Sequence, residues 1–316
     1  MTTEAAFIAA LRRLSADPAA RDLLDDAAVL AVGGRHLVLT HDMIVEDVHF
    51  LPTDPPEDVA WKLVAVNLSD LAAKGARPLG VLMGYSLGGD AEWDTAFVRG
   101  LGSALAAMNC PLLGGDTVSA PTRVLGLTAI GEATAPPPSR SGATAGDLLW
   151  VSGTIGDAGA GVRIARGDAC GPAALLDRYR RPQPRIAAGQ ALAPLVSAMM
   201  DVSDGLLIDA RRLAEASGAA LEVDLEAVPL SQDYARLCGK DRGAVLAAAT
   251  AGDDYELLFT TAAHYAGAVA ELATSLAIPF TPIGRVNSGS GLHLLEAGRS
   301  VPLPDRLGYE HVPQRP

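Results

Sequence analysis

The sequence predicts an α+β protein built from two domains. Its 316 residues are 49% hydrophobic, which is enough for two domains with separate cores. In both halves, short apolar runs typical of strands alternate with segments of helical periodicity. The proline-rich run at 135–139 is the clearest break in composition between the halves. We therefore expect one domain over 1–136 and a second over 137–316.

The first half begins with a predicted amphipathic helix and a hairpin whose two strands are joined by consecutive glycines. A long helix then follows two prolines and ends at Gly75, a residue type that favours helix ends. Lys62, Asn67 and Asp70 interrupt the apolar pattern of this helix. The expected helices cover 3–16, 57–74 and 91–108, and the expected strands cover 27–32, 36–40, 79–86, 124–132 and, as a short buried strand before a Gly-Gly-Asp turn, 111–113.

The second half opens with a strand and a glycine-rich segment at 153–161 that leads into a helix. A basic link punctuated by prolines, at 180–185, precedes the next helix. Strands and helices then alternate toward the end of the chain. The expected strands cover 148–151, 221–225, 256–260 and 282–286, and the further helices cover 186–196, 206–216 and 262–276.

Net charge and cysteine content narrow the classes of partner. The net charge of −12, from 25 basic and 37 acidic residues, disfavours nucleic acid, whose phosphates demand a basic surface. Bound divalent cations would still let the protein hold small phosphorylated molecules. The three cysteines form no C-x-x-C pair, so we expect neither a zinc site nor a disulfide framework, and a cytoplasmic location. The sequence has no signal-peptide pattern and no bilayer-long apolar run, so we expect no membrane partner.

The segment Asp201-Val202-Ser203-Asp204-Gly205 places two carboxylates and a hydroxyl ahead of an apolar, helix-like run. Taken alone, it is typical of an Asp/Ser cap on a helix. Other acidic side chains also lie at the edges of apolar runs, where each could be a turn residue: Asp25, Asp26, Asp42, Asp70, Asp116, Asp253 and Asp254. Six such places in one chain favour a shared cation site assembled from distant segments. Hard carboxylate oxygens suit Mg²⁺, which bridges protein carboxylates and phosphate oxygens.

Common nucleotide and hydrolase motifs are absent or incomplete. The chain has no G-x-x-x-x-G-K-[ST] loop and no G-x-G-x-x-G at the start of a helix. Residues 84–88 match G-x-S-x-G, but a nucleophile elbow needs a helix directly after its serine. Here Gly88, Gly89 and Asp90 intervene before the next helical pattern, so Ser86 is interpreted as a strand-end residue.

Several stretches together resemble one known family. They are Asp25 to Leu30, the segment from Asp42 to Val48-His49-Phe50, Ala65 to Ala73, Gly114 to Thr117, Arg140 to Gly142, Asp201 to Gly205, and Asp254 to Leu257. In this order they resemble the thiamine-monophosphate kinase family, from about Asp25 to the C-terminus. The superfamily also holds aminoimidazole ribonucleotide synthetase, selenophosphate synthetase and hydrogenase maturation proteins.

The resemblance implies a fold and a reaction. The fold would be an N-terminal sheet-and-helix domain that dimerises through its sheet, a C-terminal α+β domain, and ATP in the cleft between them. The reaction would transfer the γ-phosphoryl group of ATP to the phosphate of thiamine monophosphate, giving thiamine diphosphate and ADP. Such a transfer needs positioning and charge neutralisation more than a general base. The implied cofactor is Mg²⁺, as several ions, and the implied assembly is a homodimer.

The resemblance also implies roles for individual residues. The implied metal ligands are Asp26, Thr40, His41, Asp42, Asp70, Asp116, Asp201 and Asp204. The implied ATP contacts are Gly115, Asp116, Arg140 and Ser203, and the implied substrate contacts are His49, Asp253 and Tyr309.

The chain departs from the family pattern at Leu24, where glycine is usual, at His41, where a small hydroxyl residue is usual, and at Asp253, where glutamate is usual. Two alternatives stay open. One is another ATP-using enzyme of the same superfamily. The other, which these departures leave open, is a non-catalytic protein that binds a nucleotide or a thiamine phosphate.

Overall fold

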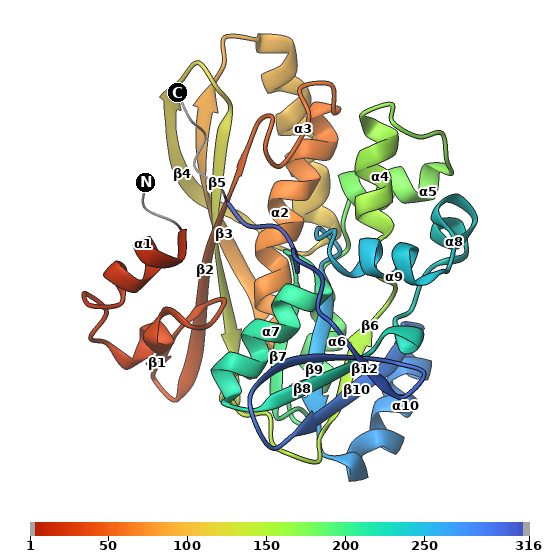
Figure 1. Cartoon of the computed structure of the whole chain (residues 1–316). Coiled ribbons are helices and arrows are strands. Elements are labelled where there is room, and N and C mark those ends of the chain that lie inside the picture. Colours follow the sequence, from red (N-terminus) through yellow and green to blue (C-terminus); the bar gives the residue numbers. More distant parts are fainter. Residues whose placement is uncertain (1–3, 312–316) are drawn as a thin grey trace.

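The structure, a computed structural model, describes residues 4–311 and contains two mixed β-sheets with helices packed on them (Figure 1). The first sheet has the strand order β1-β2-β5-β3-β4, and the second has the order β12-β11-β8-β10-β6-β9-β7. The first sheet comes entirely from the first half of the chain, and the second entirely from the second half. The predicted two-domain α+β class is therefore confirmed.

The first half carries five strands and three α-helices within the described residues. The strands are β1 (Ala28–Val32), β2 (Arg35–Val45), β3 (Arg77–Leu87), β4 (Leu112–Ser119) and β5 (Val124–Ala133). The helices are α1 (Glu4–Leu11), α2 (Pro56–Ala73) and α3 (Ala91–Ala107), with a 3₁₀ turn at Pro18–Leu23. Neighbouring strands pair antiparallel except β3 and β4, which are parallel.

The second half surrounds its seven-stranded sheet with shorter helices. The strands are β6 (Leu148–Ser152), β7 (Ala198–Val202), β8 (Ala220–Asp224), β9 (Glu256–Thr261), β10 (Phe280–Asn287), β11 (Gly291–Glu296) and β12 (Arg299–Val301). The helices are α4 (Asp157–Ala165), α5 (Ala173–Arg180), α6 (Ile186–Leu192), α7 (Leu206–Ser217), α8 (Gln232–Cys238), α9 (Arg242–Ala249) and α10 (Ala266–Leu276). None of the helices within 4–311 combines the length and apolar content that crossing a bilayer requires.

Helix α2 lies between the first sheet and the second half of the chain (Figure 1). Prolines at its start and acidic residues in its first turn favour its N-terminus, and Gly75, at φ 59°, follows its C-terminal end. Residues from Val59 onward are almost all buried, because one side packs on the sheet and the other on the second half. Polar side chains on this helix are therefore held away from water between the two halves.

The two halves are also joined by ion pairs that cross between them. Arg180 bonds to Asp54 at 2.9 Å, and Arg181 bonds to Asp58 at 2.5 Å. The indole nitrogen of Trp61 donates to the carbonyl of Pro182 at 2.9 Å. The basic link at 180–185 thus fastens the second half to the region around the start of α2.

Three sequence expectations for the first half were wrong. Helix α1 ends at Leu11 rather than at residue 16, and the predicted start at residue 3 lies outside the described residues. Strand β2 continues through Asp42 to Val45, because β5 pairs with it along that whole length. Residues 111–113 are not a short buried strand before a turn. Instead β4 runs through Gly114, Gly115 and Asp116 to Ser119, and it is exposed because it forms the sheet edge.

In the second half, the sequence missed the short helices α5, α8 and α9 and the strands β11 and β12. These helices have seven or eight residues, too few for a periodic pattern to stand out. Strand β7, which ends at Val202, was seen only as an apolar run before the acidic segment. Its pairing with β9 supplies the partner that the local sequence does not reveal.

Candidate active site

The candidate site begins with the polar side chains of α2. Asn67 accepts the backbone N–H of Asp42 at 2.8 Å and donates to the carbonyl of Leu63 at 3.0 Å. Ser69 donates its hydroxyl to Asp201 at 2.5 Å. The helix therefore holds strand β2 on one side and strand β7 of the second half on the other. Buried polar groups need such partners, because an unpaired one costs free energy.

Three carboxylates from distant segments converge beside α2. Asp26 precedes β1, Asp70 lies on α2, and Asp201 lies on β7. Oxygen atoms of the three lie within 4.8 Å of one another. Asp70 and Asp201 are buried, and the ion pairs found among the described residues include neither of them. Their side-chain donors are hydroxyls, from Thr40 to Asp70 and from Ser69 to Asp201.

This crowding changes the protonation of the carboxylates. Burial, reinforced by the charge of Asp26, raises the pKa of Asp201 to about 8. Burial and the charges of Asp42 and Asp201 raise the pKa of Asp70 well above its ordinary value. Asp42 keeps contact with solvent, but partial loss of hydration and the charges of Asp26 and Asp204 raise its pKa to about 6. The carboxylates therefore carry less than their full negative charge near neutral pH unless a cation joins them.

Asp26 behaves differently because two protein cations hold it. Lys74 Nζ lies 2.8 Å from one oxygen, and the guanidinium of Arg140 contacts the other. Burial alone would raise the pKa of Asp26, but Arg140 and Lys74 hold it well below its ordinary value. Arg140 reaches Asp26 from the segment that joins the two halves.

Strand alternation separates the side chains of Thr40, His41 and Asp42. Thr40 is buried toward α2, where its hydroxyl donates to Asp70. Asp42 lies on the same face, two residues along. His41 is exposed on the opposite face, where Nδ1 lies 2.9 Å from the hydroxyl of Thr128. The imidazole is therefore not with the carboxylates, and only the backbone carbonyl of His41 could serve them.

The loop of Asp201 to Gly205 is shaped by a residue that the sequence did not single out. Asp209, in the first turn of α7, is fully buried and accepts the backbone N–H groups of Ser203, Asp204 and Gly205 at 3.1 to 3.2 Å. Neither Asp204 nor Ser203 caps this helix, so that reading of the segment was wrong. The side chain of Asp204 instead bonds to Arg212 at 2.5 Å.

Gly115 and Asp116 do not join the carboxylates within one chain. Asp116 is exposed on β4. Across the sheet it pairs with Gly84, which pairs with Gly126, which pairs with Met43 on β2. Asp116 and Met43 are therefore three strand spacings apart, about 14 Å. Met43 shares its face with His41, so Asp116 lies on the face opposite Thr40 and Asp42.

The three residues implied as substrate contacts are gathered at one place. The rings of His49 and Tyr309 both lie beside His311, at centroid distances of 5.4 and 5.0 Å. Lys62 Nζ donates to the carbonyl of His49 at 2.9 Å and bonds to Asp253 at 2.8 Å. Burial, together with the neighbouring charge of His311, lowers the pKa of His49.

Asp253 has a positive φ of 64°, and its N–H donates to the carbonyl of Ser203 at 2.7 Å. Tyr309 donates its N–H to the carbonyl of Asp204 at 2.8 Å. Both segments are thereby attached to the loop that follows Asp201. The region around His49, Asp253 and Tyr309 is thus connected to the acidic cluster by backbone hydrogen bonds.

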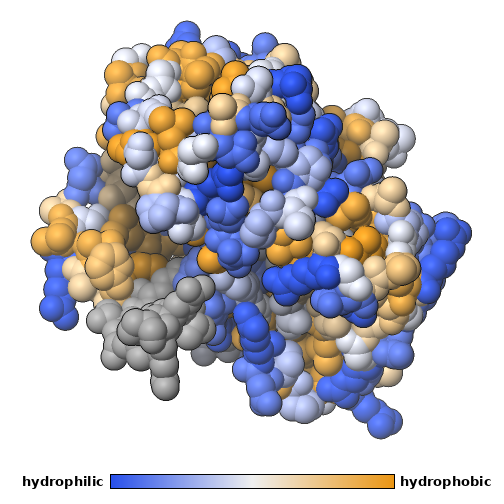
Figure 2. Space-filling view, turned by 90° about the horizontal axis from the view of Figure 1, so that it is seen from above, coloured by the Kyte–Doolittle hydropathy of each residue, from blue (hydrophilic) through white to orange (hydrophobic). Residues whose placement is uncertain are grey.

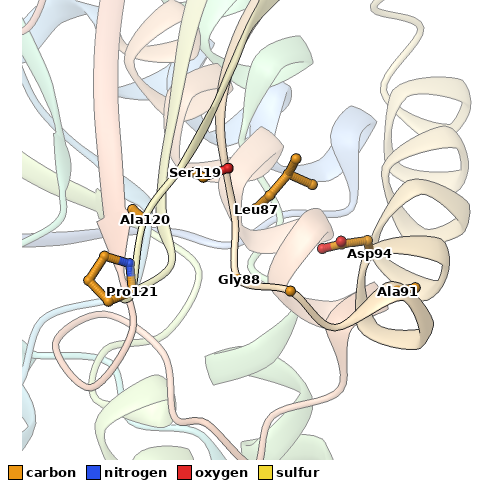
Figure 3. Close-up of a pocket in the computed structure, with 8 residues that line it drawn as sticks. Leu87, Gly88, Ala91, Asp94, Ser119, Ala120 and Pro121 are labelled. Atoms are coloured by element: carbon orange, nitrogen blue, oxygen red, sulfur yellow. The ribbon is translucent and has the colours of Figure 1, made fainter.

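A hollow lies at the ends of β3 and β4, beside α3, and its lining includes none of these residues (Figure 3). It is lined by Leu87, Gly88, Ala91, Asp94 and Pro121 among others. Asp94 accepts a hydrogen bond from Tyr85 at 2.6 Å. The neighbouring Ser86 accepts the N–H of Val124 at 2.7 Å, which agrees with a structural strand-end role rather than a nucleophile.

Sequence reasoning missed Ser69, Lys74 and Asp209 as parts of the site, and it noted Lys62 only as an interruption of the apolar pattern. The available signal was a polar residue inside an otherwise apolar helix, which marks a paired buried group. Identifying the partners requires the tertiary structure, because they lie far away in the sequence.

Comparison with known protein families shows which class of protein this chain belongs to. The family profile AIR synthase related protein, N-terminal domain, matches residues 24–133, and the corresponding C-terminal domain profile matches 144–295. Fold and site thus define a two-domain protein of the AIR synthase related class.

The relatives narrow the class to a family. A thiamine-monophosphate kinase of Caulobacter vibrioides is 41% identical over 308 residues, covering 93% of this chain and 86% of the relative. One of Salmonella typhimurium is 37% identical, covering 91% and 90%. The solved structure named AaThiL complexed with AMPPCP and TMP superposes with a TM-score of 0.86 at 30% identity, covering 98% and 97%. The chain belongs to the thiamine-monophosphate kinase family.

Proposed function

We propose that this protein transfers the γ-phosphoryl group of ATP to thiamine monophosphate and releases thiamine diphosphate and ADP. Its relatives bear the name of this kinase, and AaThiL was solved with AMPPCP, an ATP analogue, and TMP. The observation that carries the proposal is the convergence of Asp26, Asp70 and Asp201 from three segments of the chain. Two mutually repelling phosphates need such a centre of cation binding to approach each other.

The donor set fits Mg²⁺. The three converging groups are carboxylates, and Asp42 and the Thr40 hydroxyl lie next to them, so the site offers hard oxygen ligands. The pKa values of Asp42 and Asp201 are raised because burial and the charges of neighbouring carboxylates outweigh any compensation by protein cations. When bound, Mg²⁺ ions neutralise the phosphate oxygens. We propose Asp26, Asp42, Asp70, Asp201 and Asp204 as side-chain ligands, with Thr40 and the carbonyl of His41 beside them.

The chain's own residues then position the reactants. Arg140 lies at the junction of the two halves, where its guanidinium can move from Asp26 to a nucleotide phosphate. The N–H groups after Asp201 are held by Asp209, so the position of Ser203 beside the cluster is fixed before ATP arrives. His49, Asp253 and Tyr309 lie together, where they would hold the thiamine portion of the acceptor.

The chemical step requires no protein base. A phosphate oxygen of thiamine monophosphate attacks the γ-phosphorus, and the bond from that phosphorus to the bridging oxygen of ADP breaks. The acceptor phosphate, with a second pKa of about 6, is already ionised near neutral pH. The protein contributes alignment and charge neutralisation, which supply most of the catalysis in phosphoryl transfer.

We further propose a homodimer that pairs the outer faces of the two N-terminal sheets. That face exposes Leu30, Met43, Leu82 and Val118, at 40% to 57% of their surface. Figure 2 shows hydrophobic groups in the left part of the view, the side on which both α1 and this sheet lie in Figure 1. Exposed apolar patches of this kind commonly mark interfaces.

The dimer would also explain Gly115 and Asp116. Within one chain, Asp116 lies on the outer face of the sheet and cannot reach the cluster beside α2. We propose that Gly115 and Asp116 contact ATP and metal at the site of the other subunit. We also propose a domain boundary near residue 136. A cytoplasmic location is proposed because the three cysteines are free.

One assay tests the function. Purified protein is mixed with ATP, MgCl₂ and thiamine monophosphate, and both thiamine diphosphate and ADP are quantified. Equal amounts of both products are expected, and EDTA should abolish them. ATP hydrolysis with a different acceptor would favour another enzyme of the superfamily. Binding of both ligands without turnover would favour the non-catalytic alternative.

A further inference from the structure

Lys74 is a lysine buried completely at the C-terminal end of α2. It is one of three lysines in the chain, with Lys62 and Lys240. Its ammonium bonds to Asp25, lies 2.8 Å from Asp26 and donates to the carbonyl of Met199 at 3.4 Å. An ammonium group without water is stable only when carboxylates compensate its charge, as here.

One of those carboxylates also belongs to the candidate cation site. Asp26 lies within 4.8 Å of Asp70 and Asp201, measured between oxygen atoms. The ammonium of Lys74 and any cation bound by the three carboxylates therefore share Asp26. Since two positive charges that share a ligand repel each other, the lysine must affect how the site binds metal.

The second protein cation at Asp26 is less firmly placed. The Arg140 side chain keeps about 20% of its surface exposed, and its Nε is buried without a hydrogen-bond partner in the structure. Lys74, by contrast, has no exposed surface and a second carboxylate, Asp25, which Arg21 holds at 2.5 Å. Arg140 can leave Asp26 when another cation arrives, whereas Lys74 is held in place.

We propose that Lys74 is a built-in counter-ion of the cation site. Its fixed charge compensates the buried carboxylates in the metal-free protein and lowers the affinity of the site for divalent cations. This inference rests on the cation site of the proposed function and goes beyond it, because it assigns part of the charge neutralisation to the chain itself.

The first test compares Lys74→Met with Lys240→Met, which removes the same charge from an exposed position. Binding of Mn²⁺, a probe of Mg²⁺ sites, is measured from the electron paramagnetic resonance signal of the free ion. Lys74→Met is expected to bind Mn²⁺ at least about tenfold more tightly than the wild type, since a unit charge a few ångströms away opposes the metal. Lys240→Met should bind it like the wild type.

Thermal unfolding supplies a second readout on the same variants. In EDTA, Lys74→Met should melt below the wild type, and saturating MgCl₂ should restore most of the difference. Unchanged Mn²⁺ affinity, with the same loss of Tm in EDTA and in MgCl₂, would mean that Lys74 is only a structural ion pair. If the wild type binds no Mn²⁺, the proposed cation site itself is contradicted.

Nuclear magnetic resonance of the wild type tests the proposal even if Lys74→Met does not fold. Protein labelled with ¹³C and ¹⁵N in lysine has only three sets of side-chain signals to assign. Titration with MgCl₂ should shift the Lys74 signals and leave those of Lys240 unchanged. Lys74 signals that stay unchanged at MgCl₂ concentrations that raise Tm would overturn the proposal.

Discussion

At the scale of single residues, the site buries carboxylates close to one another, an arrangement that does not favour protein stability. Asp70 and Asp201 are buried close to each other and to Asp26, with hydroxyl groups as side-chain donors. Desolvation and like charges both oppose ionisation there. Such an arrangement destabilises the metal-free protein and is useful only when a cation binds. Perturbed carboxylates of this kind are typical of functional sites.

Neutralising one of these carboxylates should therefore separate stability from activity. We expect Asp70→Asn and Asp42→Asn each to lower kcat at least about a hundredfold, because a metal ligand is lost. In EDTA both variants should melt at or above the wild-type Tm, because the change relieves repulsion. The exposed Asp168→Asn is the matched control and should change neither property. Near-normal turnover in Asp42→Asn or Asp70→Asn would contradict the metal assignment.

The raised pKa values also predict how pH and metal act together. Asp42 and Asp201, with pKa values of about 6 and about 8, bind protons in the folded protein that the unfolded chain releases near pH 4. Their contribution to the stability of the metal-free protein therefore falls as pH rises from about 4 to about 8. Mg²⁺ binds the ionised form, so the increase in Tm that it causes should grow between about pH 5.5 and about pH 8.5.

Melting curves with and without MgCl₂ across this range measure that increase directly. His49, whose pKa is lowered, acts in the opposite direction on total stability, so the difference caused by MgCl₂ is the informative quantity. In Asp201→Asn, the increase in Tm caused by MgCl₂ should depend less on pH. If the wild-type increase in Tm is equally large at both ends of the pH range, the proposed coupling between protonation and metal binding is excluded.

At the scale of elements, helices α2 and α3 meet through a glycine. Gly100 is buried in α3, and a Cβ atom there would lie 2.3 Å from the Cα of Glu57 at the start of α2. Gly102, two residues along the same helix, has open space at the corresponding position. The close approach helps to place α2, which carries the buried polar side chains of the site. Packing of α3 is thus linked to the geometry of the site through α2.

This pair of glycines allows a matched test. Gly100→Ala should destabilise the protein by at least about 2 kcal/mol, because the backbone of α2 must move. Gly102→Ala should be neutral or stabilising by up to about 1 kcal/mol, because alanine favours a helix over glycine. Urea unfolding measures both values. Equal effects of the two changes would show that the contact between α2 and α3 adapts easily.

At the scale of the whole molecule, the candidate site lies where the two halves meet. Asp26, Asp42 and Asp70 come from the first half, and Asp201 and Asp253 come from the second. Contacts such as Ser69 to Asp201 and Lys62 to Asp253 cross between the halves beside the site. The relative placement of the halves therefore decides whether the site exists.

The proposed dimer adds Asp116 from a second subunit, and mixing two inactive variants tests this. We expect Asp42→Asn and Asp116→Asn each to be inactive as homodimers. After subunit exchange, mixed dimers should contain one site with both changes and one intact site, which restores about a quarter of wild-type activity. As a control, each variant alone is taken through the same exchange procedure. If exchange is demonstrated but no activity returns, Asp116 either acts at the site of its own chain or takes no part in catalysis.

The sequence by itself determined the two-domain α+β class, the helix that became α2, and the acidic side chains at the edges of apolar runs. These features are local, because periodicity reports burial and turn chemistry over a few residues. Family resemblance added candidate roles, including those of Arg140 and Tyr309, that no local pattern indicates.

Only the tertiary structure decided which of these residues meet. It put Asp26, Asp70 and Asp201 together, turned the imidazole of His41 to the opposite face, and placed Asp116 on an exposed edge strand. It also showed that Lys74 and Asp209 hold the site from positions that look unremarkable in the sequence. Strand pairing and helix packing between distant segments set these contacts, and no local pattern encodes them.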